Sequence, residues 1–189
     1  MKNRLAVGLL LLATRAWGDP IPGLLDVHWD EGAEDCKQAT MAPIQVHQYE
    51  PQTFILRESF CADFEAPLLY LLIGDEEALL VDTGATEDSA QMPLVKTVMD
   101  LLPSKGEGKI PLLVLHTHGH GDHRAADAQF KAVPGVVVVP PEVDELRTAL
   151  NLPQWPEGVA HIALGGRTVE VIAAPGHQPA HLIFYDDRT

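Results

Sequence analysis

Short apolar runs broken by turn-forming residues dominate the first half of the chain. The runs at 44–49, 53–57, 68–73 and 78–81 are separated by proline, glycine and acidic residues, a pattern typical of short antiparallel strands. Residues 74–77 (GDEE) suit a hairpin turn between the last two runs. Residues 19–43 are instead rich in Asp, Glu, Gly and Pro without a sustained period, so we expect an irregular N-terminal segment there.

Beyond residue 88, helical and strand patterns alternate. Apolar residues recur at helical spacing between 92 and 102, which predicts a helix over 89–102. Four valines at 136–139 lie between Pro-Gly and Pro-Pro pairs, and we expect a strand buried on both faces. Further helices are predicted at 123–130 and 142–150, and further strands at 112–115, 159–164, 168–173 and 182–185. Strands first, then strand–helix alternation, indicate a layered α/β domain.

The N-terminus has the pattern of an export signal. Lys2 and Arg4 precede an apolar run at 5–13, and the small residues of Ala16-Trp17-Gly18 stand where a signal peptidase cleaves. A membrane anchor is the alternative, but the run is shorter than the roughly 20 residues that span a bilayer. We therefore expect residues 1–18 to be a cleaved signal peptide, and the mature chain to be periplasmic or secreted and free of the membrane.

The charge of the chain limits its partners. The 189 residues carry a formal net charge of −14, and removing residues 1–18, which hold three basic and no acidic residues, takes it to −17. A surface this acidic repels phosphate backbones, which argues against nucleic acid and against anionic membrane surfaces as partners. A small molecule in a metal-lined cleft remains compatible, because the ion sets the local field there.

Two cysteines, Cys36 and Cys61, leave two interpretations open. An oxidising compartment would permit one disulfide between them, and a free thiol is the alternative. Neither cysteine lies near the histidine-rich segment described next, so a thiol ligand to a metal is disfavoured. The disulfide is the slightly better prediction.

One segment, residues 116–123 (HTHGHGDH), has a composition that packing does not require. Its imidazoles and carboxylate are ligands that a zinc-like cation prefers. The segment follows a predicted buried strand, at the end where open α/β sheets place their sites. Gly119 separates His118 from His120, so both side chains can turn toward one ion. Asp122 and His123 could supply the first ligands of a second, adjacent metal ion. Two ions about 3.5–4 Å apart would share a water and lower its pKa.

A tetrahedral site needs a further ligand, and His177 is the candidate. It lies in a loop (APGH, 174–177) that follows a predicted strand, as the first cluster does. A solvent-exposed turn histidine is the alternative, and the upstream cluster favours the ligand.

These segments together resemble the metallo-β-lactamase superfamily. Residues 117–123 match its H-x-H-x-D-H motif, residues 80–84 (LVDTG) resemble the strand end that precedes that motif, and residues 175–181 (PGHQPAH) resemble the segment with its third histidine. The three occur in the family's order and the resemblance covers about residues 53–189. It implies an αββα sandwich with a di-metal hydrolytic site at one edge.

The resemblance also implies roles for single residues. His118, His120 and His177 would hold one metal, while Asp122 and His123 would hold the other, with Asp122 also orienting the attacking hydroxide. Asp82 would fix the ligand loop by hydrogen bonds, although a plain turn aspartate is an equal alternative.

Two further histidines flank these ligands. His116 forms a second H-x-H with His118, but the register of the motif makes it a structural residue or a hydrogen-bond partner of a ligand. His181 would lie near the site, contacting substrate or the far nitrogen of a ligand. His28, His47 and His161 have no motif around them and are expected on the surface or on strands.

The chain also departs from the family's pattern. Many members have a later aspartate that bridges both metals and a last histidine, and nothing after His181 matches either. We therefore expect the domain, residues 44–189, to be a partial one, truncated at its C-terminus. No G-x-S-x-G serine motif and no phosphate-binding glycine loop is present.

The resulting hypothesis is an exported hydrolase in which metal-activated hydroxide cleaves an ester, thioester, lactone or β-lactam bond of a small molecule. Zinc is the expected cofactor, as one or two ions, with iron possible. The alternatives are a mononuclear iron oxidoreductase similar to the persulfide dioxygenases of the superfamily, and an inactive metal-binding fragment.

Overall fold

The computed structural model describes residues 21–38 and 40–189, so the predicted signal peptide lies outside the described residues. Residues 21–38 and 40–43 follow an irregular course, as expected, with one 3₁₀ turn, η1 (Cys36–Gln38). Within the described part of the chain, no helix has the length and apolar character needed to cross a bilayer.

Six strands form the larger of two main sheets, in the order β1-β2-β3-β4-β7-β8. The first four make an antiparallel meander, while β7 pairs in parallel with both β4 and β8. The strands are β1 (Ile44–Glu50), β2 (Thr53–Glu58), β3 (Leu68–Ile73), β4 (Ala78–Val81), β7 (Leu112–Leu115) and β8 (Val136–Val138). β4 and β7 therefore end at the same edge of the sheet, which is where the histidine-rich segment begins.

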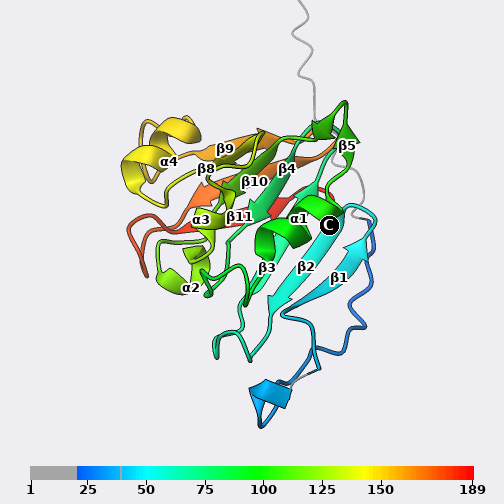
Figure 1. The fold of residues 1–189 in the computed structure, drawn as a ribbon. Coiled ribbons are helices and arrows are strands. Elements are labelled where there is room, and N and C mark those ends of the chain that lie inside the picture. Colours follow the sequence, from blue (N-terminus) through cyan, green and yellow to red (C-terminus); the bar gives the residue numbers. More distant parts are fainter. Residues whose placement is uncertain (1–20, 39) are drawn as a thin grey trace, which may run out of the picture.

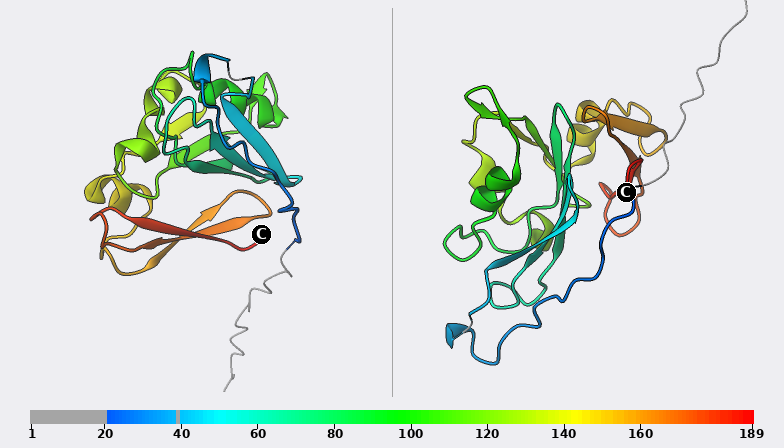
Figure 2. Two further views of the ribbon diagram at one scale, coloured as in Figure 1. Left: turned by 90° about the horizontal axis from the view of Figure 1, so that it is seen from below. Right: turned by 90° about the vertical axis from the view of Figure 1, so that its right-hand side faces the viewer.

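Three antiparallel strands form the smaller sheet, in the order β11-β10-β9. They are β9 (Val159–Ala163), β10 (Thr168–Ala173) and β11 (Leu182–Asp186). A two-stranded ribbon, β5 (Ser104–Lys105) with β6 (Gly108–Lys109), stands apart. The two main sheets pack face to face as layers (Figures 1 and 2), and apolar side chains such as Leu79, Val81, Val169 and Val171 fill the space between them.

Helices cover the outer face of the larger sheet. Leu94 and Val98 of α1 (Leu94–Leu101) and Phe130 of α3 (Asp127–Phe130) are fully buried in the apolar cluster on that face. α2 (Gly121–Arg124) contains the last residues of the histidine segment and precedes α3, and Leu146 of α4 (Val143–Ala149) joins the cluster between the sheets. Helix, sheet and sheet thus form successive layers, which are three of the four layers of the predicted αββα sandwich.

Two sets of contacts join the sheets at the end away from the histidine segment. The amides of Asp75 and Glu76 donate to the carbonyls of Gly165 and Leu164, each at 2.9 Å. Beside them the buried guanidinium of Arg167 donates to the Asp186 carboxylate at 2.8 and 2.7 Å, and reaches the β1–β2 turn through Thr53 Oγ1 at 2.8 Å. Gly165 has φ +86°, and a Cβ there would lie 2.8 Å from the Glu76 backbone nitrogen, so this junction requires glycine.

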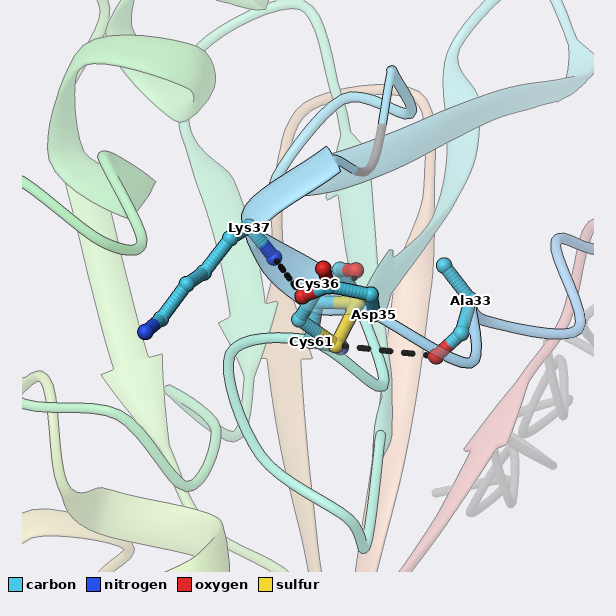
Figure 3. The surroundings of a disulfide bond; sticks show 6 residues. Ala33, Asp35, Cys36, Lys37 and Cys61 are labelled. Atoms are coloured by element: carbon cyan, nitrogen blue, oxygen red, sulfur yellow. Dashed lines mark hydrogen bonds between the residues drawn. A yellow bond between two sulfur atoms is a disulfide. The ribbon is translucent and has the colours of Figure 1, made fainter.

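A disulfide anchors the irregular N-terminal segment. Cys36 bonds Cys61, which lies on the loop between β2 and β3, with the two Cα atoms 5.3 Å apart (Figure 3). The disulfide prediction is therefore confirmed, and the thiol-ligand alternative is excluded. Because the β2–β3 loop lies at the same sheet edge as the end of β4, the bond ties residues 33–38 to that edge of the molecule.

Three of the predicted elements need correction. The helix expected over 89–102 begins only at Leu94, because Asp88 forms a local turn by accepting the amides of Ala90 and Met92, at 2.9 and 2.8 Å, and Pro93 follows that turn. The helix expected over 123–130 is two short helices, since the amide of Ala125 donates to the Gly84 carbonyl at 2.9 Å.

The third correction concerns the valine strand. β8 is an edge strand that pairs only with β7, and its central residue, Val137, is 59% exposed. The prediction that this strand is buried on both faces is therefore wrong. The ribbon β5–β6 was not predicted.

Candidate metal centre

Three imidazoles converge where the two sheets meet. His118 and His120 lie on the loop between β7 and α2, and His177 lies on the loop between β10 and β11. His120 Nδ1 is 3.1 Å from His118 Nε2 and 3.1 Å from His177 Nε2. These three nitrogen atoms lie within 4.8 Å of one another, although they come from loops more than fifty residues apart in the sequence.

Backbone geometry brings the two loops together. β7 and β10 end at the same edge of the sandwich, and the amide of Leu182, at the start of β11, donates to the Thr117 carbonyl at 2.7 Å. This bond crosses from the small sheet to the loop of the large sheet. This hydrogen bond holds the two loops at a fixed distance without the help of an ion.

The environment of His118 favours the neutral ring. His118 is only 6% exposed, and this burial is the main reason that its pKa is lowered from the usual 6.5 to about 4. The charges of the neighbouring histidines lower the pKa further, and these are His123, His120, His177 and His181. Its second ring nitrogen, Nδ1, is 3.1 Å from Thr117 Oγ1. A neutral His118 whose Nδ1–H points to Thr117 leaves the Nε2 lone pair toward His120, as a metal ligand requires.

Asp82 holds the base of the histidine loop. It is buried, follows β4 directly and has φ +67°, an uncommon backbone conformation for a residue with a side chain. Its carboxylate accepts the Thr117 amide at 2.7 Å, the Thr117 hydroxyl at 2.9 Å and His123 Nδ1 at 2.8 Å. This one side chain therefore orients both the loop backbone and a neighbouring ring.

Asp122 and His123 form a pair beside the three imidazoles. His123 Nε2 is 3.0 Å from Asp122 Oδ2, and the ring centroid of His123 is 4.1 Å from that of His118. The hydrogen bond to Asp82 raises the pKa of His123; burial opposes this, and the charges of Asp82, Asp122 and Glu65 add to the rise.

His116 lies in a different environment from the other histidines of its segment. Its ring is fully buried and its Nε2 contacts Asp127 Oδ1 at 2.8 Å, while Thr83 Oγ1 donates to the same oxygen at 2.8 Å. Burial alone would raise the pKa of Asp127, but the hydrogen bonds and charges of His116, Thr83 and Arg124 outweigh it, and the pKa is lowered. Asp127 was not predicted, because no motif includes it.

His181 and Gln178 complete the surroundings on the β10–β11 loop. The His181 ring centroid is 5.4 Å from that of His118 and 6.1 Å from that of His177, so His181 lies beside the three converging rings and not among them. The Gln178 side-chain amide nitrogen contacts His120 Nε2. Gln178 was also not predicted. Its proximity to His177 in the sequence was the only available signal.

The donor set fits a zinc-like ion. Two nitrogens that share a tetrahedral zinc at about 2.0–2.1 Å lie roughly 3.3 Å apart. The 3.1 Å separations at His120 Nδ1 are close to this value. Imidazoles from two loops, of which His118 and His120 have the second ring nitrogen in contact with another side chain, meet the requirements of a structured metal site.

Comparison with known proteins agrees with this architecture. The family model described as the metallo-beta-lactamase superfamily matches residues 62–189, which include all the histidines of the cluster. The chain belongs to the metallo-beta-lactamase superfamily.

Curated relatives named hydroxyacylglutathione hydrolase match part of this chain. That of Xanthomonas oryzae pv. oryzae (strain MAFF 311018) is 29% identical over 119 residues, covering 62% of this chain and 41% of the relative. That of Rhizobium meliloti (strain 1021) is 31% identical over 106 residues, covering 54% of this chain and 39% of the relative. The chain thus spans about two fifths of the length of these relatives.

Solved structures share the fold. A flavoprotein of Thermotoga maritima aligns with a TM-score of 0.56 at 18% identity, covering 79% of this chain and 41% of that chain. A metallo-beta-lactamase of Cronobacter sakazakii aligns with a TM-score of 0.53 at 18% identity, covering 76% and 58%. The predicted fold class is confirmed by this likeness.

Proposed function

We propose that this superfamily member is a metal-dependent hydrolase of small acyl compounds. Zinc is the proposed metal, bound at His118, His120 and His177, with Asp122 and His123 as ligands of a second ion. The observation that carries this proposal is the convergence of three ring nitrogens, 3.1 Å apart around His120 Nδ1, from two different sheets. A bound divalent ion would lower the pKa of a water molecule and polarise the carbonyl of the substrate.

The residues around the ligands would have separate tasks. Asp122, whose side chain is 29% exposed, would accept a proton from the attacking water and orient it toward the carbonyl. Asp82 would keep His123 in the tautomer with its lone pair on Nε2, since the carboxylate accepts the Nδ1–H. His181 would face the substrate from the β10–β11 loop.

An acyl thioester is the substrate class that we favour among the carbonyl compounds. The support is the naming of the relatives as hydroxyacylglutathione hydrolases, whose substrates are thioesters. The experiment is to purify the protein, strip metal with a chelator, add zinc and follow thiol release from a 2-hydroxyacyl thioester of glutathione. We expect turnover that requires the added ion, and loss of both turnover and bound metal in His118→Ala.

The matched control is His161→Ala. His161 lies on β9, where its ring contacts Glu170 at 3.2 Å, and we expect its replacement to leave metal content and turnover unchanged. Bound iron with oxygen uptake in the presence of a glutathione persulfide would establish the dioxygenase alternative. Metal binding without hydrolysis of thioester, ester, lactone or β-lactam would establish the metal-binding alternative and overturn the proposal.

Export is also proposed for this chain. It rests on residues 1–18 of the sequence, and the Cys36–Cys61 disulfide is compatible with an oxidising compartment. Expression with the complete N-terminus, followed by N-terminal sequencing of the exported protein, should give a mature chain that starts at Asp19. Retention of Met1 in a cytoplasmic product would contradict it.

A further inference from the structure

The two ring nitrogens of His120 have different neighbours. Nδ1 lies between His118 Nε2 and His177 Nε2, at 3.1 Å from each. Nε2 faces the opposite way and contacts the side-chain amide nitrogen of Gln178. His120 and Gln178 lie on different loops, so this contact spans the same gap between the sheets that an ion would bridge.

Imidazole tautomerism makes this contact important for metal binding. A neutral ring carries one hydrogen, so Nδ1 offers a lone pair only when the hydrogen is on Nε2. A side-chain oxygen opposite Nε2 stabilises that tautomer by accepting the Nε2–H. The NH₂ group of Gln178 lies at this contact, and a half-turn about the last side-chain bond exchanges it with the amide oxygen, which then faces His120 Nε2.

The other ligand of the same loop already has such a partner. His118 Nδ1 is 3.1 Å from the hydroxyl of Thr117, and that hydroxyl donates to Asp82 at 2.9 Å. His118 is therefore oriented from within its own sheet. His120 has its partner on the opposite loop, next to His177 in the sequence. One short segment, 177–178, would thus supply both a ligand and the group that orients another ligand.

We propose that Gln178 is a positioning residue of the metal centre. Its side-chain oxygen accepts a hydrogen bond from His120 Nε2–H, which holds the ring with the Nδ1 lone pair directed toward His118 and His177. This inference rests on the metal site of the proposed function. Partners of this kind typically contribute a factor of about 10–100 to metal affinity.

The test compares two variants of similar size. Gln178→Leu removes both polar groups, and Gln178→Glu retains an acceptor and removes the donor. Zinc affinity is measured by competition with a chromophoric chelator at constant pH, without reference to catalysis. We expect about 10–100-fold weaker binding in Gln178→Leu and affinity equal to or above that of the unsubstituted protein in Gln178→Glu.

A spectroscopic measurement separates hydrogen bonding from the added charge of glutamate. Nitrogen-15 NMR of the His120 ring should show the hydrogen on Nε2 in the zinc-loaded protein and in metal-free Gln178→Glu, and a mixture of tautomers in metal-free Gln178→Leu. Gln154→Ala, at an exposed residue between α4 and β9, is the matched control and should leave affinity and spectra unchanged.

The outcomes distinguish this inference from the function on which it rests. Equal zinc affinity in the unsubstituted protein and in Gln178→Leu would overturn the role of Gln178 while leaving the metal site intact. Absence of zinc binding in the unsubstituted protein would overturn the proposed function itself. Equal weakening in the Leu and Glu variants would show that the contact only fills space, which also overturns the inference.

Discussion

The rings of His118 and His177 lie edge to face with centroids 4.8 Å apart, although His118 follows a strand of the six-stranded sheet and His177 follows a strand of the three-stranded sheet. Any ion that binds both rings therefore also links the two sheets. At the opposite end of the sandwich, Arg167 provides the corresponding link without a metal. Metal binding and the stability of the whole fold are consequently expected to depend on each other.

The first prediction is that zinc raises the melting temperature of the protein. A ligand that binds only the folded state adds about 2.7 kcal/mol at a concentration 100 times its dissociation constant. Scanning calorimetry of metal-free and zinc-loaded protein should show this increase. His177→Ala should abolish it, because the link between the sheets is lost, whereas His161→Ala should retain it. An equal increase in all three proteins would mean that zinc binds elsewhere.

The second prediction concerns the acid side of the stability profile of the metal-free protein. The pKa of His118 is about 4 in the folded state and 6.5 when unperturbed, chiefly because the ring is buried. Between these values the unfolded state binds a proton that the folded state does not, so the free energy of unfolding decreases as the pH falls from 6.5 to 4. Above that window His118 has no effect.

Urea unfolding at several pH values checks this prediction. His118→Asn, which cannot titrate, should reduce the loss of stability between about pH 7 and about pH 5. His161→Asn, at the exposed position on β9, serves as the control and should keep the profile of the unsubstituted protein. Identical profiles for His118→Asn and the unsubstituted protein would contradict the lowered pKa.

Most elements of the fold could be predicted because their patterns are local. The runs at 68–73, 78–81 and 168–173 coincide with β3, β4 and β10. Val137 shows where this fails: an apolar run predicts a strand, but only the sheet order determines that β8 is an edge with its central residue exposed. The position of a strand within a sheet depends on tertiary structure, so a run of valines does not predict it.

The same distinction applies to the candidate site. His118, His120 and His177 could be singled out as candidate ligands because ligand spacing and the family motif mark them, and the structure brings their rings together. Asp127 and Gln178 carry no such mark, and their contacts with His116 and His120 exist only after the loops have folded together. A local motif thus identifies ligands more readily than it identifies the side chains that orient them.

The third prediction is that Asp82→Asn weakens binding of a second metal ion more than binding of the first. The carboxylate accepts His123 Nδ1 at 2.8 Å and the Thr117 amide at 2.7 Å. An asparagine can still accept one of these but presents an NH₂ group to the other, which favours the wrong tautomer of His123. Partners of this kind contribute about 10–100-fold to affinity.

Zinc titration with metal analysis measures both sites. We expect the second equivalent to weaken by that factor and the first to weaken less, since Asp82 contacts His123 directly but reaches His118 only through the Thr117 hydroxyl. Asp75→Asn, on the β3–β4 turn at the opposite end of the sheet, is the control. A larger loss in the first equivalent than in the second would disprove the assignment of Asp82 to His123.

The last prediction is that Arg167→Met costs about 3–5 kcal/mol of unfolding free energy, because removing one partner of a buried ion pair leaves a buried charge uncompensated. The guanidinium side chain is 0% exposed and donates to Asp186 at 2.8 and 2.7 Å. Burial alone would raise the pKa of Asp186, but Arg167 and Thr189 outweigh it and lower the pKa, so the stabilisation is present at neutral pH and is lost as the pH falls through the folded pKa. Urea unfolding at neutral pH tests the loss, with Lys96→Met as the control: its pair with Asp100 is on the surface, and its removal should cost only about 0.3–0.5 kcal/mol. Similar small losses in both variants would show that Arg167 does not hold the two sheets together.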